Sequence, residues 1–90
     1  MEKFLFVGVS PKPFYGCNYW YIDESFSVKP KTYVWVRMGR HNREQVVYVD
    51  SVKLCDENNA PYPPQLAKRI IRIATEKEIE LAKLDWEIYL

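Results

Sequence analysis

The stretch TYVWVRMGRHNREQVVYV, residues 32–49, consists of two apolar runs on either side of a basic, polar loop. Both runs alternate with period two and are rich in Val, Tyr and Trp, which is typical of strands with one buried face. The loop GRHNRE contains Gly39 and Asn42, which readily adopt the left-handed backbone conformation of tight hairpin turns. The stretch therefore predicts a β-hairpin with strands at 32–38 and 45–54.

Alternation in the first of these strands separates two kinds of side chain. If the valines and Met38 face a core, the opposite face carries Tyr33, Trp35 and Arg37. Two interpretations of that second face remain open. Rings beside cations can stack on nucleic-acid bases, or the same rings can lie beneath a helix from elsewhere in the chain.

Two further strands are predicted before the hairpin. The run KFLFVGV, residues 3–9, is unbroken and apolar, and the prolines that follow it end a buried strand. The run NYWYI, residues 18–22, predicts a second strand with Tyr19 and Tyr21 on one face. The segment CDENNAPYPP, residues 55–64, is punctuated by Asn and Pro and predicts a loop.

The C-terminal segment predicts a short strand and then a helix. Thr75, followed three residues later by Glu78, has the spacing of a capping box, in which each side chain bonds a backbone N–H at a helix start. We therefore expect a strand near 69–74 and a helix over 76–89. Four apolar residues share one face of that helix: Ile79, Ala82, Trp86 and Tyr89.

These elements predict an α+β fold in a single domain, residues 1–90. The expected architecture is a small antiparallel β-barrel or curled sheet of about five strands with a C-terminal helix. The composition, 48% hydrophobic and 28% charged, is that of an ordinary globular protein. No stretch has the length of a membrane span, and the N-terminal apolar run is shorter than a signal-peptide core. Two cysteines are too few for a disulfide framework, so we expect a cytoplasmic protein with reduced thiols.

Charge is distributed unevenly along the chain. The net charge is only +1, but residues 27–53 contain six basic and two acidic side chains, a net charge of +4. Residues 76–90 contain two basic and five acidic side chains, a net charge of −3. The sequence thus predicts a polarised molecule with a basic hairpin and an acidic C-terminal segment.

Catalytic and metal-binding motifs are not apparent in the sequence. His41 is the only histidine, and it lies in a polar loop with no nucleophile placed beside it by sequence. The two cysteines and His41 lack the spacing of a zinc site, and the three glycines are too scattered for a phosphate-binding loop. We therefore expect a non-enzymatic protein without metal or cofactor.

Binding of nucleic acid is the leading interpretation of the hairpin. Its cations can neutralise phosphates, and its rings can stack on bases, each stacked base contributing about 1–3 kcal/mol. The expected ligand is single-stranded or forked DNA. The candidate residues in and beside the hairpin are Lys31, Tyr33, Trp35, Arg37, Arg40, His41, Arg43 and Tyr48.

The order of features along the chain resembles the N-terminal DNA-binding domain of the primosomal replication-restart helicase. The segments that carry the resemblance are FLFVGV, PKPF, YWYI, YVWVRMG, VVYVDSV, KRIIRIA and LAKLDWEIYL. The segment APYPPQLAKRIIR also resembles small free-standing proteins of Gram-positive bacteria and their mobile elements. The first resemblance implies the small β-rich fold and binding of a DNA 3′ end.

The helicase domain receives the terminal nucleotide through an aromatic residue, an aspartate and a later basic residue. The resemblance assigns the aromatic role to Tyr19 and the basic role to Lys68 or Arg69. Trp20 stands where the family has the aspartate, so the carboxylate that would contact a free 3′ hydroxyl is missing.

Two other hypotheses follow from the same features. A protein-binding inhibitor or regulator from a phage or mobile element, for example an anti-CRISPR-type blocker of a host nuclease, can use the acidic C-terminal segment against a basic groove. Interface physics also favours Trp, Tyr and Arg, so the rings do not separate the two hypotheses. Self-association through an open sheet edge is the third, which leaves a monomer or a weak homodimer as the expected state.

Overall fold

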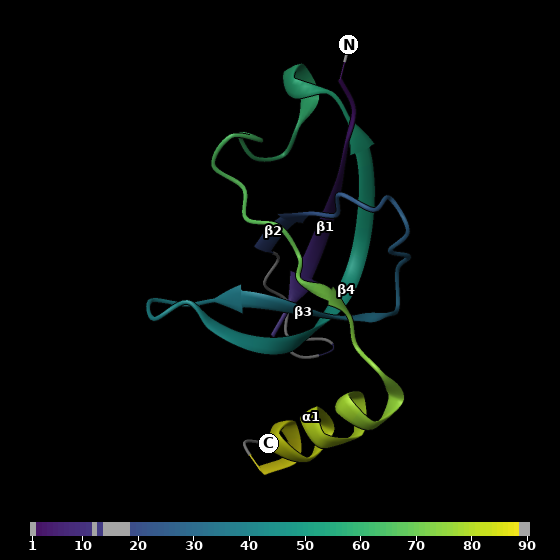
Figure 1. Cartoon of the computed structure of the whole chain (residues 1–90), viewed down its shortest axis with the longest axis vertical. Helices are drawn as coiled ribbons and strands as arrows, with labels where there is room; N and C mark the ends of the chain where they lie inside the picture. Colours follow the sequence, from purple (N-terminus) through teal and green to yellow (C-terminus); the bar gives the residue numbers. More distant parts are fainter. Residues whose placement is uncertain (1, 12, 14–18, 89–90) are drawn as a thin grey trace.

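The computed structural model describes residues 2–11, 13 and 19–88, with the last two of these described by their backbone alone. Within these residues, five strands and a C-terminal helix form the fold (Figure 1). The sheet has the order β2-β1-β4-β3-β5, and each neighbouring pair is antiparallel. The elements are β1 (Phe4–Ser10), β2 (Tyr19–Ile22), β3 (Tyr33–Met38), β4 (Arg43–Cys55), a 3-10 turn (Glu57–Asn59), β5 (Arg72–Ile73) and α1 (Glu76–Ile88).

The predicted architecture is confirmed as a curled antiparallel sheet, which does not close into a barrel. Strand β4 is thirteen residues long, and it pairs through its first half with β3 and through its second half with β1. The register with β1 shifts between Gly8 and Val9, which leaves Asp50 as the extra residue of a β-bulge. A bulge bends its strand and increases the local twist, and Figure 1 shows β4 curving so that β3 lies across the direction of β1.

The main core lies inside the curl. Its buried side chains are Val7, Val9, Tyr21, Val28, Val34, Val36, Val47 and Val49. The bulge changes the phase of alternation in β4, so that Val52, three residues after Val49, packs against the same cluster. Tyr21 donates a hydrogen bond of 2.7 Å from its hydroxyl to the carbonyl oxygen of Arg37. This bond ties the outer strand β2 to β3 across the core.

A second, smaller core covers the other face of β1 and β2. Phe6, Ile22, Cys55 and Ala67 are buried in it, and the segment after β4 supplies its lid. Gly8 lies on this face, where a Cβ atom would come within 2.9 Å of the Ser51 hydroxyl oxygen and 3.2 Å of the Trp20 ring. Burial on both faces explains why β1 is an unbroken apolar run.

The strand predicted at 69–74 is mostly irregular, and only Arg72 and Ile73 form β5. The reason is that this segment forms hydrogen bonds first with one edge of the sheet and then with the other. Its first part makes a single parallel bridge to β2, in which the Ile70 N–H donates to the Ile22 carbonyl at 3.0 Å. Its second part pairs with β3, where the Ala74 N–H donates to Tyr33. The segment therefore pairs with neither β2 nor β3 over the length of a full strand.

The other predicted boundaries agree closely with the structure. The strand predicted at 45–54 is longer at both ends, and the loop predicted at 55–64 includes the 3-10 turn. The hairpin turn has positive φ at Gly39 and Asn42, as predicted. Residues 18 and 89, assigned to predicted elements, lie outside the described residues. Within the described chain, no helix combines the length and the hydrophobicity needed to span a membrane.

The loop after β2 is organised by one buried carboxylate. Asp23 is 1% exposed, and its Oδ1 accepts from the N–H and the hydroxyl of Ser25. Its Oδ2 accepts from the backbone N–H groups of Ser27 and Val28 at 2.9 and 2.8 Å. Burial by itself would raise the pKa of Asp23, but these hydrogen bonds favour the ionised form more strongly, so its pKa lies below the ordinary value. The carboxylate thus positions Val28 in the main core.

Replacing Asp23 by Asn should destabilise the fold by about 2–4 kcal/mol, because a carboxamide has one acceptor oxygen where four donors converge. The lowered pKa means that the stabilisation from the carboxylate is present above the ordinary carboxyl pKa and is lost as pH falls through the folded value. Urea unfolding at neutral and acidic pH measures both effects. Glu24→Gln, an exposed neighbour, is the matched control with an expected change below about 0.5 kcal/mol. Equal effects of the two substitutions would contradict this role of Asp23.

Candidate functional site

The outer face of the hairpin formed by β3 and β4 lies against helix α1. Tyr33 stacks on Trp86 with ring centroids 5.7 Å apart and tilts against Tyr48 at 5.3 Å. The ammonium group of Lys83 lies 5.8 Å from the centre of the Tyr33 ring. The rings predicted to face away from the core do so, and the helix covers them. Of the two interpretations of this face, the structure shows the one in which the rings lie beneath the helix.

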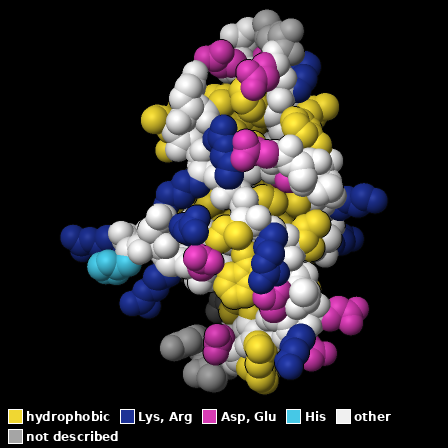
Figure 2. Space-filling view, in the orientation of Figure 1, with side chains coloured by type: hydrophobic (Ala, Val, Ile, Leu, Met, Phe, Trp, Pro, Cys, Tyr) yellow, Lys and Arg dark blue, Asp and Glu magenta, His cyan; other side chains and the backbone are white. Residues whose placement is uncertain are grey.

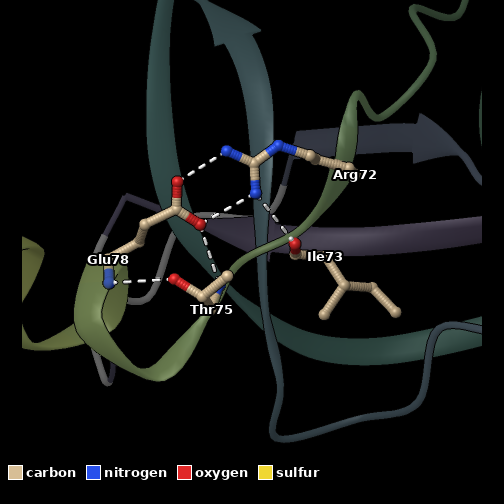
Figure 3. Close-up of polar contacts among 4 residues, drawn as sticks. All are labelled: Arg72, Ile73, Thr75 and Glu78. Atoms are coloured by element: carbon tan, nitrogen blue, oxygen red, sulfur yellow. Dashed lines mark hydrogen bonds and ion pairs between the residues drawn. The ribbon is translucent and has the colours of Figure 1, made fainter.

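Helix α1 is anchored at its first turn (Figure 3). The predicted capping box is present, with the Thr75 N–H donating to Glu78 at 2.8 Å and the Glu78 N–H donating to the Thr75 hydroxyl at 3.3 Å. The same carboxylate accepts two hydrogen bonds from the Arg72 guanidinium, at 2.8 and 2.5 Å. Arg72 also lies over the Trp35 ring, 5.5 Å from its centre. One arginine on β5 therefore joins the helix start to the aromatic face of β3.

The electrostatics of this anchor favour both charged forms. The hydrogen bonds from Arg72 are the main cause that holds the pKa of Glu78 far below its ordinary value of 4.5, and the Thr75 N–H adds to it. The hydrogen bond to Glu78 in turn raises the pKa of Arg72. The Trp35 indole N–H is buried and makes no hydrogen bond of good geometry. Its nearness to Glu78 is a smaller cause of the lowered pKa of that carboxylate.

Beyond this anchor, the helix packs incompletely on the sheet. A groove of about 790 Å³ lies between them, lined on the sheet side by Trp35, Arg43 and Val46. On the helix side, Ala82, Asp85 and Trp86 face it. Arg37 forms an ion pair with Glu44 across the hairpin at 3.4 Å, and both side chains are about half exposed. Such an exposed pair contributes little to stability.

The turn of the hairpin carries exposed basic side chains, as the sequence predicted. Arg40, His41 and Arg43 are exposed there, and Figure 2 shows the histidine (cyan) and neighbouring cations (dark blue) projecting from the body. Lys68, distant in sequence, joins them because its ammonium group donates to the Asn42 side-chain oxygen at 2.6 Å. The fold thus adds a cation to the turn.

A hollow of about 370 Å³ lies at the base of this turn. Its walls are mostly apolar and aromatic: Tyr19, Trp20, Tyr21, Met38, Gly39, Tyr62, Leu66 and Lys68. Tyr19 and Tyr62 are 46% and 44% exposed, so part of each ring is open to a ligand. Two residues assigned by the helicase resemblance, Tyr19 and Lys68, therefore line one hollow. The other candidate basic residue, Arg69, donates to the carbonyl oxygens of Pro64 and Ala67 and does not line it.

The sequence did not predict that the residues of this hollow lie together. Tyr62 and Leu66 belong to the segment predicted as a loop and its continuation, and nothing in their local pattern connects them with the hairpin turn. What identifies them is the exposure of their large side chains, which only the structure reveals. Lys31 is exposed and has a φ of 67°, and its N–H donates to the carbonyl oxygen of Val49 in β4. It is not among the residues that line the hollow.

Reactive groups in the described part of the chain are few. Cys55 is buried as a free thiol in the smaller core, and burial is the main cause that raises its pKa. Cys17 lies outside the described residues. Among the residues that the structure describes, no three His, Cys, Asp or Glu side chains come together as a metal-binding cluster.

Comparisons of this chain with protein-family models, with curated proteins and with solved structures found no match. The interpretation of the hollow and the basic turn therefore depends on their own geometry and chemistry.

Replacing Glu78 by Gln should loosen α1 from the sheet, because the variant loses the charge that pairs with Arg72 and weakens the cap. We expect a lower free energy of unfolding at neutral pH and stronger quenching of tryptophan fluorescence by acrylamide, since the Trp86 and Trp35 rings become more accessible. Glu80→Gln makes the same charge change at an exposed position of the same helix and should leave both measurements near those of the wild type.

The pH dependence separates this electrostatic anchor from a purely steric one. Because the folded pKa of Glu78 lies below its ordinary value of 4.5, its stabilisation is present above that pH and is lost as pH falls toward the folded value. The difference between wild type and Glu78→Gln should therefore shrink on acidification. A difference that stays constant would contradict the electrostatic anchor.

Proposed function

We propose that this chain is a non-enzymatic module that binds single-stranded nucleic acid at the base of the hairpin turn. The observation that carries the proposal is the hollow with Tyr19 and Tyr62 in its wall and Lys68 at its edge. An apolar hollow with partly exposed rings suits a planar base, which gains free energy by stacking. The adjoining cations of the turn suit the phosphates on either side of that base.

The geometry of the turn supports an extended ligand. Arg40 and His41 are exposed in the turn and follow Gly39 of the hollow wall, so a strand with a base in the hollow can pass its backbone along them. The tie between Lys68 and Asn42 holds the ammonium group between the hollow and the turn. A ligand that spans both features gains stacking and charge neutralisation together.

The proposed site differs from the surface first inferred from the sequence. Tyr33 stacks on Trp86 of helix α1 and Tyr48 packs against Tyr33, while Trp35 lines the groove beneath the helix with Arg72 over its ring. Arg37 pairs with Glu44. The stacking role therefore passes from these rings to Tyr19 and Tyr62. The basic turn keeps its expected role in contacting phosphates.

Fluorescence anisotropy with a labelled single-stranded DNA oligonucleotide tests the proposal at low and moderate salt. We expect binding that weakens steeply with salt, because phosphate contacts release counterions. Tyr19→Ala and Tyr62→Ala should each weaken binding about tenfold, in keeping with one lost stacking contact. Lys68→Ala should weaken binding and reduce its salt dependence.

Two matched controls keep the test specific. Lys53→Ala removes an exposed cation of β4 outside the hollow, and Phe26→Ala removes a 54% exposed ring from the loop after β2. Both variants should bind as the wild type does. Absence of binding at low salt, or equal losses in the control and hollow variants, would overturn the proposal.

A further inference from the structure

Helix α1 has a second apolar face that the fold leaves open. Leu81 and Leu84 are each 57% exposed, and their spacing of three residues places them on neighbouring positions of the helix surface. Ala82 and Trp86 face the groove on the sheet side, and Leu81 borders it as well. Leu84 therefore lies away from the sheet, and Leu81, although it borders the groove, keeps more than half of its side chain exposed.

Acidic side chains outnumber basic ones on the helix that carries these leucines. Residues 76–90 have a net charge of −3, and Glu76, Glu80 and Asp85 are exposed along the helix. Glu78 is the acidic residue whose charge is already neutralised, through Arg72. The outer surface of α1 therefore combines two exposed leucines with a net negative charge, which Lys77, one turn before Leu81, offsets in part.

The same molecule carries the complementary surface. The hollow at the base of the hairpin turn is apolar, and Leu66 at its rim is 68% exposed. The cations beside it are Lys68, which lines it, and Arg40, the neighbour of Gly39 in its wall, whereas Arg43 lines the groove beneath α1. An exposed apolar surface beside positive charge thus complements exposed leucines on a helix of net negative charge.

These two surfaces point in different directions on one chain. The molecule measures 44 × 25 × 21 Å, and in Figure 1 α1 forms one end of the long axis while the hairpin turn projects to the side. The first turn of α1 is held in place by Arg72. Contact between the two surfaces therefore joins separate copies of the chain.

We propose that the leucine face of α1 from one copy docks on the hollow and basic turn of a second copy. The contact is head to tail, because it uses two different surfaces. Each copy then keeps one free surface of each kind, so association continues into short chains as concentration rises. The helix and a nucleic acid would occupy the same hollow, but the self-association itself does not depend on nucleic-acid binding.

Sedimentation velocity without nucleic acid, over a series of protein concentrations and at two salt concentrations, measures the association. We expect the average mass to increase with concentration and to decrease with salt, because the contact joins opposite charges. Leu81→Ser combined with Leu84→Ser should weaken association about tenfold or more. Leu54→Ser changes a leucine that is 61% exposed on β4 and should leave the association unchanged.

Mixing two variants provides the decisive measurement. The helix variant with both serines lacks the docking face, and a second variant, Leu66→Ser with Lys68→Glu, lacks the receiving surface. Each should be monomeric alone, and the mixture should form one-to-one pairs that grow no further, which also shows that both variants are folded.

Three results would overturn the proposal. The first is a wild-type monomer at all concentrations, which would leave the acidic leucine face to a different basic partner. The second is a symmetric dimer that either variant still forms. The third is a failure of the two variants to pair although the wild type associates. Loss of DNA binding in the anisotropy measurement leaves all of these outcomes unaffected, so the two proposals fail separately.

Discussion

The bend of β4 at Asp50 is the constraint on which the rest of this structure depends. One strand must pair with β3 along its first half and with β1 along its second half, and the extra residue at the bulge allows the change of direction. The Ser10 hydroxyl donates a hydrogen bond to the Asp50 carboxylate. This bond holds the bulged residue against the end of β1. Because the sheet curls at this point, the valines of three strands meet in one core, and the outer face of the hairpin is left for the helix.

The segment over residues 68–74 follows from that curl. With the two sheet edges brought toward each other, one short stretch of chain can bond to Ile22 on one edge and to Tyr33 and Trp35 on the other. This crossing places Lys68 beside the hairpin turn and Arg72 beside the start of α1. The position of Lys68 at the hollow and the helix anchor are therefore consequences of one connection, although they lie on different sides of the molecule.

Sequence reasoning was most accurate where the deciding interactions are local. The hairpin, its left-handed turn residues and the Thr75–Glu78 capping box were all predicted, because each depends on residues a few positions apart. The fifth strand predicted near 69–74 is present but much shorter, since the hydrogen bonds of this segment are divided between two distant strands. The alternation of Tyr33 and Trp35 showed that they face away from the core, but it could not show which element covers them.

The sequence by itself therefore determined the strand and helix periods, the turn chemistry and the polarisation of charge, which are properties of neighbouring residues. Only the tertiary structure decided that Trp86 stacks on Tyr33, that Arg72 rather than a hairpin cation engages Glu78, and that Tyr19, Tyr62 and Lys68 share a hollow. These contacts join residues from separate elements, and their geometry depends on how far the sheet curls. A curl set by one bulged residue is a small local feature, yet it determines which side chains are covered and which remain available for binding.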